Sequence, residues 1–331
     1  MNDTNEEFLN EFYGPTAQWF SLFLYIMVIL ILSSNMFLIV IILTSKNLRN
    51  KSSNWFLVGF AMSGFLHGVA HVSDGVAIQF GSADNGLLCS IAGSFHFITG
   101  ANSFGFPLLI AADRYYKITD PQPNTFSLGH TLFTDVCIVP LIFGWFCFVI
   151  LFNMPLLLNN AFGEDTVGFC GIKKFTEVRI MLMYLCVIVI AFAALPLSYV
   201  YYKRLAKWIK QNRRSNNAEN RKRTKEIMLM IKLIVIVPLV FNTTSLLLGW
   251  GQAFFPEMPM WLRRILISPY YVSNVVDPWL TIILVQPIRR RALQLLRKFK
   301  ATASVSVQRA PVRISVIKDE LFRPTAAAKP R

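Results

Sequence analysis

The stretch Ala111-Ala112-Asp113-Arg114-Tyr115-Tyr116 closes an apolar segment that runs from about residue 91 to residue 110. Asp113 and Arg114 stand where that segment stops being apolar, and a polar loop follows. An acid and a base at the end of a buried helix are costly to place, so they need an explanation. The pair is either an interfacial ion pair that marks a membrane boundary or a charge latch that breaks when a helix bundle changes shape.

Seven apolar segments lie along the 331 residues, of which 54% are hydrophobic and only 15% are charged. Each segment is long enough to cross a hydrocarbon core of about 30 Å. Backbone groups in lipid must be satisfied internally, so we expect helices; the alternating pattern of membrane β-strands is absent. The segments lie at about 19–44, 53–80, 87–112, 133–158, 179–202, 227–250 and 264–286. The sequence therefore predicts an all-α membrane protein built as a seven-transmembrane helix bundle.

Lysine and arginine are shared unevenly between the two ends of this bundle. Of the 33 such residues, 27 fall on one side, five on the other, and Lys232 lies within a span. Cytoplasmic loops carry the excess of basic residues, so the N-terminus is predicted outside and the C-terminus inside. The net charge of +15 then faces the cytoplasm and lipid rather than nucleic acid. We expect a multi-pass protein of the plasma membrane.

The chain divides into four predicted regions. They are an extracellular N-terminal tail (1–18), the seven-transmembrane bundle (19–286), an amphipathic helix (287–300) and a disordered cytoplasmic tail (301–331). In the amphipathic helix, Ile288, Ala292 and Leu295 share one face and arginines occupy another, as in helices that lie in the membrane interface. The sequon that begins at Asn2 predicts glycosylation of the outer tail.

Two of the five cysteines lie at the edges of the apolar segments: Cys89 stands at the start of the third segment, and Cys170 lies in the loop after the fourth. The predicted orientation places both on the outer side, where oxidation is permitted. We expect a disulfide that pins the loop after the fourth segment over the mouth of the bundle. The alternative is two free outer thiols.

With these spans and this orientation, the chain resembles the rhodopsin-like G-protein-coupled receptors over roughly residues 19–297. Asp113-Arg114-Tyr115 lies at the inner end of the third segment, and Cys89 precedes Arg114 by 25 residues, as in that family. Further matches are Asn35 in the first segment, Trp145 and Pro155 in the fourth, and Asp277-Pro278 in the seventh. The resemblance implies a receptor that couples to a heterotrimeric G protein.

Three positions depart from the family's pattern. Gly64 stands where its sodium-binding aspartate belongs, Ile236 where its toggle tryptophan belongs, and Thr281 replaces a tyrosine. The run from Asp277 to Arg289 looks more like nematode serpentine chemoreceptors, a divergent branch of seven-helix receptors. The chain therefore combines the family's output motif with an unfamiliar relay inside the bundle.

Two ligand classes of that family are not expected. Tyr271 stands where the family carries its retinal-binding lysine, and the seventh segment contains no lysine. His96 stands where aminergic receptors carry their aspartate. We therefore expect neither a bound retinal nor the usual counter-ion for an amine ligand, and no other cofactor is predicted.

Polar groups inside the membrane are functional candidates because they are expensive to bury. Gly64, His67, His71 and Asp74 share one face of the second segment at helical spacing. We predict a ligand pocket between the helices. Its walls are His71, Asp74, His96, Asn242, Tyr270 and Tyr271. Three alternatives stay open for the histidines: ordinary core hydrogen-bonders, a zinc site and a proton sensor.

A second set of residues is expected to couple the pocket to the G protein. The set comprises Asp113, Arg114, Tyr115, Lys232, Asp277 and Pro278. Within it, we expect Lys232 and Asp277 to pair across the sixth and seventh helices as a switch element. The alternative is that Lys232 extends its ammonium group to the cytoplasmic interface.

The function that these residues predict is a G-protein-coupled receptor for an extracellular small molecule or short peptide. The alternative is a non-receptor multi-pass protein, either a transporter or a structural scaffold. An enzyme is not expected, because no zinc-protease, serine-hydrolase or phosphate-loop motif is present. The nature of the ligand does not follow from the sequence.

Overall fold

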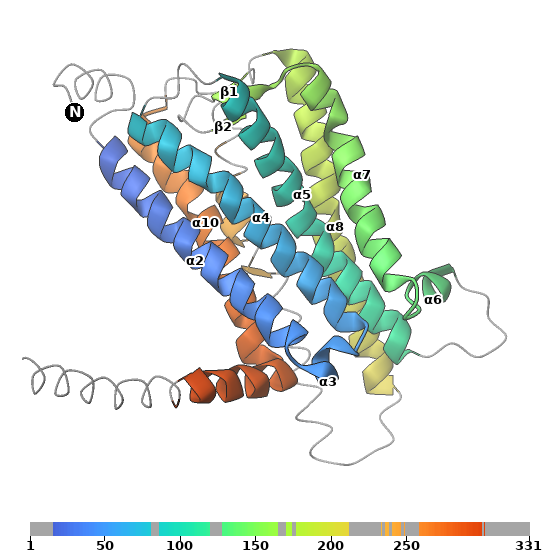
Figure 1. Ribbon diagram of the computed structural model, residues 1–331. Coiled ribbons are helices and arrows are strands. Elements are labelled where there is room, and N and C mark those ends of the chain that lie inside the picture. The colour runs from blue at the N-terminus through green and yellow to red at the C-terminus, as the bar shows by residue number, and fades with distance from the viewer. Residues whose placement is uncertain are drawn as a thin grey trace, which may run out of the picture.

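The computed structural model describes residues 16–80, 86–119, 128–164, 170–173, 177–211, 258–299 and 301, with scattered residues between 233 and 248. The elements are α2 (Ala17–Leu43), α3 (Lys46–Arg49), α4 (Ser53–Phe80), α5 (Gly86–Ile118), α6 (Leu128–Leu132), α7 (Ile138–Leu158), β1 (Phe162–Glu164), β2 (Cys170–Ile172), α8 (Val178–Gln211) and α10 (Met260–Leu284). Residues 286–299 are also helical. The long helices run side by side as a bundle (Figure 1).

The two ends of the bundle are built differently. The β1–β2 hairpin lies at one end, which we call the hairpin end (Figure 1). The short helices α3 and α6 lie at the opposite end, and the helix formed by 286–299 turns away from α10 beside them (Figure 1). On that helix Ile288 and Ala292 are buried against the bundle, while Arg289 and Arg290 are exposed.

Within the described residues, five helices are long and apolar enough to cross a membrane: α2, α4, α5, α7 and α8. The predicted span at 227–250 lies largely outside the described residues. The predicted seventh span corresponds to α10, whose N-terminal part carries Arg263 and Arg264. Lys232 and Pro238 also lie outside the described residues.

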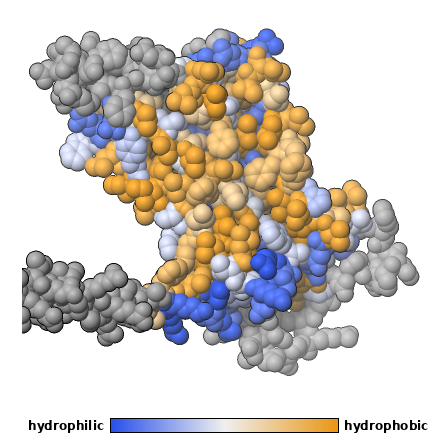
Figure 2. Space-filling model, in the orientation of Figure 1, coloured by the Kyte–Doolittle hydropathy of each residue, from blue (hydrophilic) through white to orange (hydrophobic). Residues whose placement is uncertain are grey.

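The outer surface of the bundle is apolar over its middle. Figure 2 shows hydrophobic residues across this region, with hydrophilic residues gathered towards the two ends. Large exposed side chains on the helices include Trp19, Ile29, Phe143, Leu151 and Val189. A soluble protein rarely exposes such a continuous apolar surface. The surface is that of a bundle whose helices face lipid tails.

α5 and α8 continue beyond the predicted ends of their apolar segments, to Ile118 and Gln211. Helix α5 therefore does not end at Asp113 but continues for more than one further turn, to Ile118. Hydrophobicity stops at the membrane boundary, but backbone hydrogen bonding does not. Asp113 and Lys117, which are four residues apart, form an ion pair of 3.2 Å that supports the last turn of α5.

α2 and α4 approach each other closely through small residues. A Cβ atom on Gly64 would lie 2.6 Å from Asn35 Oδ1, and one on Gly68 would lie 2.9 Å from a methyl carbon of Ile31. Glycine permits this approach because it has no side chain, as is common between membrane helices. The space beside Gly64, where the family carries an aspartate, is filled here by the side chain of Asn35.

α10 contains two prolines, Pro269 and Pro278. Pro278 has no N–H group, so the carbonyl of Asn274 four residues earlier loses its helical donor. Asn35 Nδ2 donates to this carbonyl at 3.4 Å. A side chain of α2 thereby satisfies a backbone group of α10 that would otherwise be unpaired in an apolar environment.

The hairpin is fixed to the bundle by a disulfide. β1 and β2 pair antiparallel with Gly163 opposite Gly171, and Cys170 in β2 is bonded to Cys89 in α5. The predicted Cys89–Cys170 bridge is therefore confirmed. Gly93 lies one turn further along α5, where a Cβ atom would come within 3.0 Å of the Cys170 backbone.

Candidate functional site

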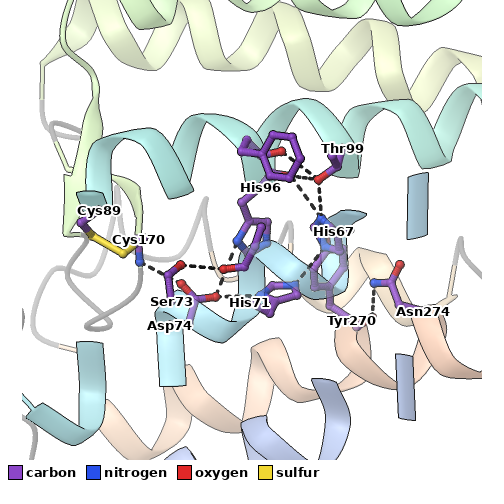
Figure 3. Close-up of polar contacts among 12 residues, drawn as sticks. His67, His71, Ser73, Asp74, Cys89, His96, Thr99, Cys170, Tyr270 and Asn274 are labelled. Carbon is purple, nitrogen blue, oxygen red and sulfur yellow. Dashed lines mark hydrogen bonds and ion pairs between the residues drawn. A yellow bond between two sulfur atoms is a disulfide. The ribbon is translucent and has the colours of Figure 1, made fainter. Parts of the chain in front are cut away.

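Four buried or half-buried ionisable side chains and a tyrosine meet in the interior near the hairpin end. We call this group the histidine cluster: His67, His71 and Asp74 of α4, His96 of α5 and Tyr270 of α10. Positions 67, 71 and 74 fall on one face of α4 because their spacings of four and three residues match the helical turn. Figure 3 shows these side chains directed towards one another, beside the Cys89–Cys170 bridge.

Asp74 joins the cluster to the hairpin. Its Oδ2 atom lies 2.7 Å from His71 Nδ1, and its Oδ1 atom accepts a hydrogen bond of 3.0 Å from the backbone N–H of Cys170. His96 Nδ1 lies 3.6 Å from the same Oδ2 atom. The carboxylate therefore fixes the orientation of one imidazole and faces a second, while its position depends on a hairpin that the disulfide holds.

The hydrogen-bond network assigns the protonated nitrogen of His67. Its Nδ1 atom lies 3.2 Å from the His96 carbonyl oxygen and 3.0 Å from Thr99 Oγ1. A carbonyl oxygen can only accept a hydrogen bond, and the Thr99 hydroxyl already donates its hydrogen to the Phe95 carbonyl oxygen at 2.8 Å. His67 Nδ1 therefore carries the hydrogen, and a neutral His67 presents a bare Nε2 to the interior of the cluster.

That bare nitrogen links α4 to α10, and the rings of the cluster extend the contact to α5. His67 Nε2 lies 3.0 Å from His71 Nε2, and the Tyr270 hydroxyl of α10 donates to it. His96 packs edge to face against His71, with ring centroids 3.8 Å apart. α4, α5 and α10 are thus joined through imidazole nitrogens rather than through apolar contacts alone.

The members of the cluster differ in how deeply they are buried. His67, His71 and Asp74 are fully buried, whereas His96 keeps 18% of its side chain exposed. Tyr271 is also fully buried and lies against His71, with ring centroids 4.5 Å apart. A polar group buried in an apolar bundle is costly unless it is paired, so the mutual contacts are what makes this cluster tolerable. His96 gives it a face towards solvent.

The structure brings together five of the six residues predicted to line the pocket. They are His71, Asp74, His96, Tyr270 and Tyr271. Asn242 is buried, and its Oδ1 atom has no hydrogen-bond partner within the described part of the chain. His67 was predicted to share the face of α4 but was not placed in the pocket, although its four-residue spacing from His71 indicates that position. Thr99 and the Cys170 N–H carried no such signal.

At the opposite end of the bundle, Asp113 is almost fully buried and its ion pair is formed with Lys117. The 3.2 Å contact lacks hydrogen-bond geometry, so it is an electrostatic pair. Lys117 Nζ also donates to Asp135 Oδ1 at 2.8 Å and to Ser52 Oγ at 2.6 Å. The expected partner of Asp113 was Arg114, but the ion pair that Asp113 forms in the described part of the chain is with Lys117.

Asp135 lies in the turn before α7 and is largely exposed. Hydrogen bonds from Lys117 and from the Ser52 hydroxyl hold the pKa of its carboxyl below the usual range, because both stabilise the ionised form. Tyr115 lies on the same end, with its ring 5.6 Å from that of Tyr201 in α8. Lys117 is therefore the centre of a charged network that links α5 to the segments on either side.

The remaining predicted residues are only partly placed. Ser273 Oγ donates to Asp277 Oδ2 at 3.3 Å, and Oδ1 has no hydrogen-bond partner among the described residues. Pro278 is buried in α10. Because Lys232 and Asn2 lie outside the described residues, the Lys232–Asp277 pair and the glycosylation site stay predictions.

The cluster also has the donor set of a metal site. One ring nitrogen from each of His67, His71 and His96 can be chosen so that all three lie within 4.8 Å of one another. Imidazole is a common ligand for zinc, copper, iron and nickel. Among the described residues, this is the group of histidine, cysteine or carboxylate side chains that meets such a geometric requirement.

Comparisons with known proteins agree on the fold. The sequence profile of the family described as "7 transmembrane receptor (rhodopsin family)" matches residues 34–280. The crystal structure of squid rhodopsin superimposes with a TM-score of 0.71 at 14% sequence identity, covering 86% of this chain and 86% of that one. No curated protein sequence matches the chain. At this identity the structural likeness establishes an all-helical, seven-transmembrane architecture and leaves the ligand open.

Proposed function

Because the chain belongs to the rhodopsin family of seven-transmembrane receptors, we propose that it binds an extracellular small molecule or short peptide at the histidine cluster. In this proposal, binding at the hairpin end activates a heterotrimeric G protein at the opposite end. Family membership makes the chain a multi-pass membrane receptor and not an enzyme. It also decides against a transporter or a scaffold, the alternatives that the sequence left open.

The observation that carries the ligand site is the meeting of α4, α5 and α10 at polar, largely buried side chains. A ligand that exchanges hydrogen bonds with His96, Tyr270 or His71 changes how these helices hold one another. Such differential contact is what allows a ligand to shift a conformational equilibrium. Ligands with hydrogen-bonding groups fit this site better than purely apolar ones, since an apolar ligand would leave the imidazoles unpaired.

We propose that the surface that contacts the G protein lies around Arg114. Arg114 and Tyr115 follow the buried Asp113, whose charge is held by Lys117. In our proposal a rearrangement of the helices exposes Arg114 to the G protein, while the Lys117 network restrains the resting state. The chain's excess of basic residues on that side supports a cytoplasmic location.

Among receptors of this family, we propose a place with the nematode serpentine chemoreceptors. The support is the run from Asp277 to Arg289 together with Gly64, Ile236 and Thr281 at three positions of the usual relay. A chemoreceptor in the plasma membrane, with its N-terminus outside, meets its ligand at the hairpin end.

Nucleotide exchange on a purified G protein tests the proposal. The receptor is reconstituted in vesicles, and fractions of a small-molecule and peptide extract are screened for faster exchange. An active fraction should lose potency at least tenfold with His96→Phe, while Arg114→Ala should abolish exchange without changing the amount of folded receptor. Unchanged exchange with Arg114→Ala would contradict the output, and unchanged potency with His96→Phe would contradict the ligand site.

A further inference from the structure

The geometry points to a transition-metal site, of the kind that takes Zn²⁺, formed by His67, His71 and His96, with Asp74 as the carboxylate that orients its second imidazole. The site coincides with the proposed ligand-binding cluster, and it rests on the proposed function only for its effect on signalling. Metal binding itself is a property of the side chains.

The first argument is a lone pair on His71 that lacks a donor. His67 Nδ1 carries its hydrogen, because its neighbours at that atom are acceptors. His71 Nδ1 faces Asp74 Oδ2 at 2.7 Å, and an ionised carboxylate can only accept. With Asp74 ionised and both rings neutral, neither Nε2 atom carries a hydrogen for the other at 3.0 Å, and the Tyr270 hydroxyl satisfies the lone pair of His67 alone. The lone pair of His71 Nε2 then faces His67 without a donor, unless a ring or Asp74 takes up a proton or a metal ion lies between the two nitrogens.

The second argument is the number and spacing of nitrogens. A proton can join two imidazoles, but a third ring is present, with ligand atoms that all lie within 4.8 Å. Zn–N bonds of about 2.0–2.1 Å in a tetrahedral site place neighbouring ligand atoms about 3.3 Å apart. The Nε2 atoms of His67 and His71 need to separate by only a few tenths of an ångström from 3.0 Å. Three histidines with one open position are a recurrent donor set for zinc.

The third argument is the shell behind the ligands. A metal-binding histidine commonly donates its other N–H to a carboxylate or a carbonyl, which sets the ring's orientation. His71 does so to Asp74, and His67 to the His96 carbonyl and Thr99. Asp74 is itself held by the Cys170 N–H, so it contributes negative charge from behind the ligands. This is a supported site rather than a chance grouping on a surface.

The partly exposed His96 gives a metal ion access to the site, and Tyr270 occupies one of the nitrogens that the ion would bind. His96 keeps 18% of its side chain exposed, so the ion can arrive from that side. The Tyr270 hydroxyl, which donates to His67 Nε2 in the structure, must release that nitrogen when the metal binds. Metal binding therefore changes the contact between α4 and α10, which are the helices that the proposed receptor function requires to move.

The test uses the purified full-length receptor, stripped with chelator and equilibrated with Zn²⁺ alone. Elemental analysis after gel filtration should find one zinc per receptor, and X-ray absorption should find imidazole nitrogens at about 2.0–2.1 Å. The triple variant His67→Phe, His71→Phe, His96→Phe should hold none. His130→Phe, which removes the fourth histidine of the chain at the other end of the bundle, is the matched control and should keep the stoichiometry.

Two further measurements keep the idea falsifiable if the triple variant fails to fold. Asp74→Asn should weaken zinc binding about 10- to 100-fold, as expected for a residue that orients a ligand. In the unmodified receptor, Zn²⁺ should protect His96 from acylation by diethylpyrocarbonate. Absence of stoichiometric zinc, its retention in a folded triple variant, or undiminished acylation of His96 would each overturn the site.

No G protein enters these measurements, so their outcome is independent of the proposed function. Adding Zn²⁺ to the nucleotide-exchange assay then separates the two questions. A change in exchange that disappears in His96→Phe makes the ion a ligand or modulator of the receptor. A bound zinc without any effect on exchange leaves the metal site standing and limits its role to structure.

Discussion

The backbone N–H of Cys170 donates a hydrogen bond of 3.0 Å to Asp74 Oδ1, across 96 positions of the chain. Asp74 also holds His71, and Cys170 is bonded to Cys89. The hairpin, the disulfide and the histidine cluster are therefore one connected unit. A change in the hairpin can reach the cluster through the Asp74 carboxylate and through the disulfide to α5, the helix that carries His96.

Replacing this carboxylate should show how much the connection contributes to stability. Asp74→Ala leaves the Cys170 N–H and the His71 ring without their acceptor, and an unpaired buried donor costs about 1–3 kcal/mol. Asp74→Asn keeps an oxygen that can accept from Cys170 and should cost less. Thermal unfolding of the purified receptor measures both. Equal losses for the two variants would show that the Cys170 hydrogen bond contributes nothing.

Gly64 should not tolerate a larger side chain. A Cβ atom there would lie 2.6 Å from Asn35 Oδ1, and overpacking of a close helix contact costs about 1–3 kcal/mol. Gly144 in α7 is the matched control, because a Cβ atom at that position has nothing within 4 Å. Gly144→Ala should be neutral or should stabilise the helix by up to about 1 kcal/mol. If Gly64→Ala unfolds at the same temperature as Gly144→Ala, the contact between α2 and α4 is not tight.

The hydrogen bond from Asn35 to the Asn274 carbonyl can be measured by a double-mutant cycle. Asn35→Ala removes the donor to a carbonyl that Pro278 deprives of its helical partner, which should cost about 1–2 kcal/mol. In a Pro278→Ala background, the new backbone N–H can satisfy that carbonyl, so the same substitution should cost less. A coupling of at least about 0.5 kcal/mol is expected from unfolding data. Independent, additive effects would contradict this role of Asn35.

The fold was largely predictable from the sequence, whereas the site was predictable only in part. Span length, basic-residue bias and the positions of Cys89 and Cys170 are local or additive features, so they indicate the bundle and its disulfide. His71 and Asp74 could be grouped because helical spacing puts them on one face of α4, and His96 could be added because it lies in the outer half of the next helix, α5. Thr99 and the Cys170 N–H could not, since their role depends on which backbone groups two packed helices bring together.

The dependence on folded geometry also explains why the sequence did not predict the ion-pair partner of Asp113. Asp113 was expected to belong with its neighbour Arg114, because the two are adjacent in the sequence. On a helix, however, side chains four residues apart lie next to each other, and adjacent ones do not. Lys117 therefore takes the ion pair at 3.2 Å. The apolar segment gave no signal for this, because α5 continues beyond its apolar part to Ile118.

The predicted pair between Lys232 and Asp277 is open to a charge-exchange test. Asp277 Oδ1 has no hydrogen-bond partner among the described residues, so the carboxylate has room for one. Lys232→Met and Asp277→Asn should each reduce nucleotide exchange at least tenfold, because each leaves the other charge uncompensated. Lys232→Asp combined with Asp277→Lys should restore part of the exchange. If the exchanged pair is as inactive as the single variants, the two residues do not form a switch.

Lys117 should stabilise the end of α5 more than its exposed partner does. Asp113 is 1% exposed, whereas Asp135 is 78% exposed. Lys117→Met leaves the buried Asp113 without its cation and should cost about 1–3 kcal/mol, below the range for a fully buried pair because Lys117 is partly solvated. Asp135→Asn should cost at most about 1 kcal/mol, as for other exposed ion pairs. Thermal unfolding of both variants at pH 7 measures the difference.

The pH dependence of the Asp135 contribution has a definite sign. Lys117 and Ser52 lower the pKa of the Asp135 carboxyl in the folded protein, so folding favours its ionised form. The contribution is therefore fully present above the unfolded pKa of about 3.9 and is lost as the pH falls through the folded pKa. The difference in unfolding temperature between the natural protein and Asp135→Asn should be constant from pH 7 to about pH 5 and shrink below about pH 4. A difference that grows on acidification would show that Asp135 is not stabilised by Lys117. In that case Asp113 alone would account for the loss of stability in Lys117→Met. The same Lys117→Met substitution should then cause no loss when it is made in an Asp113→Asn background.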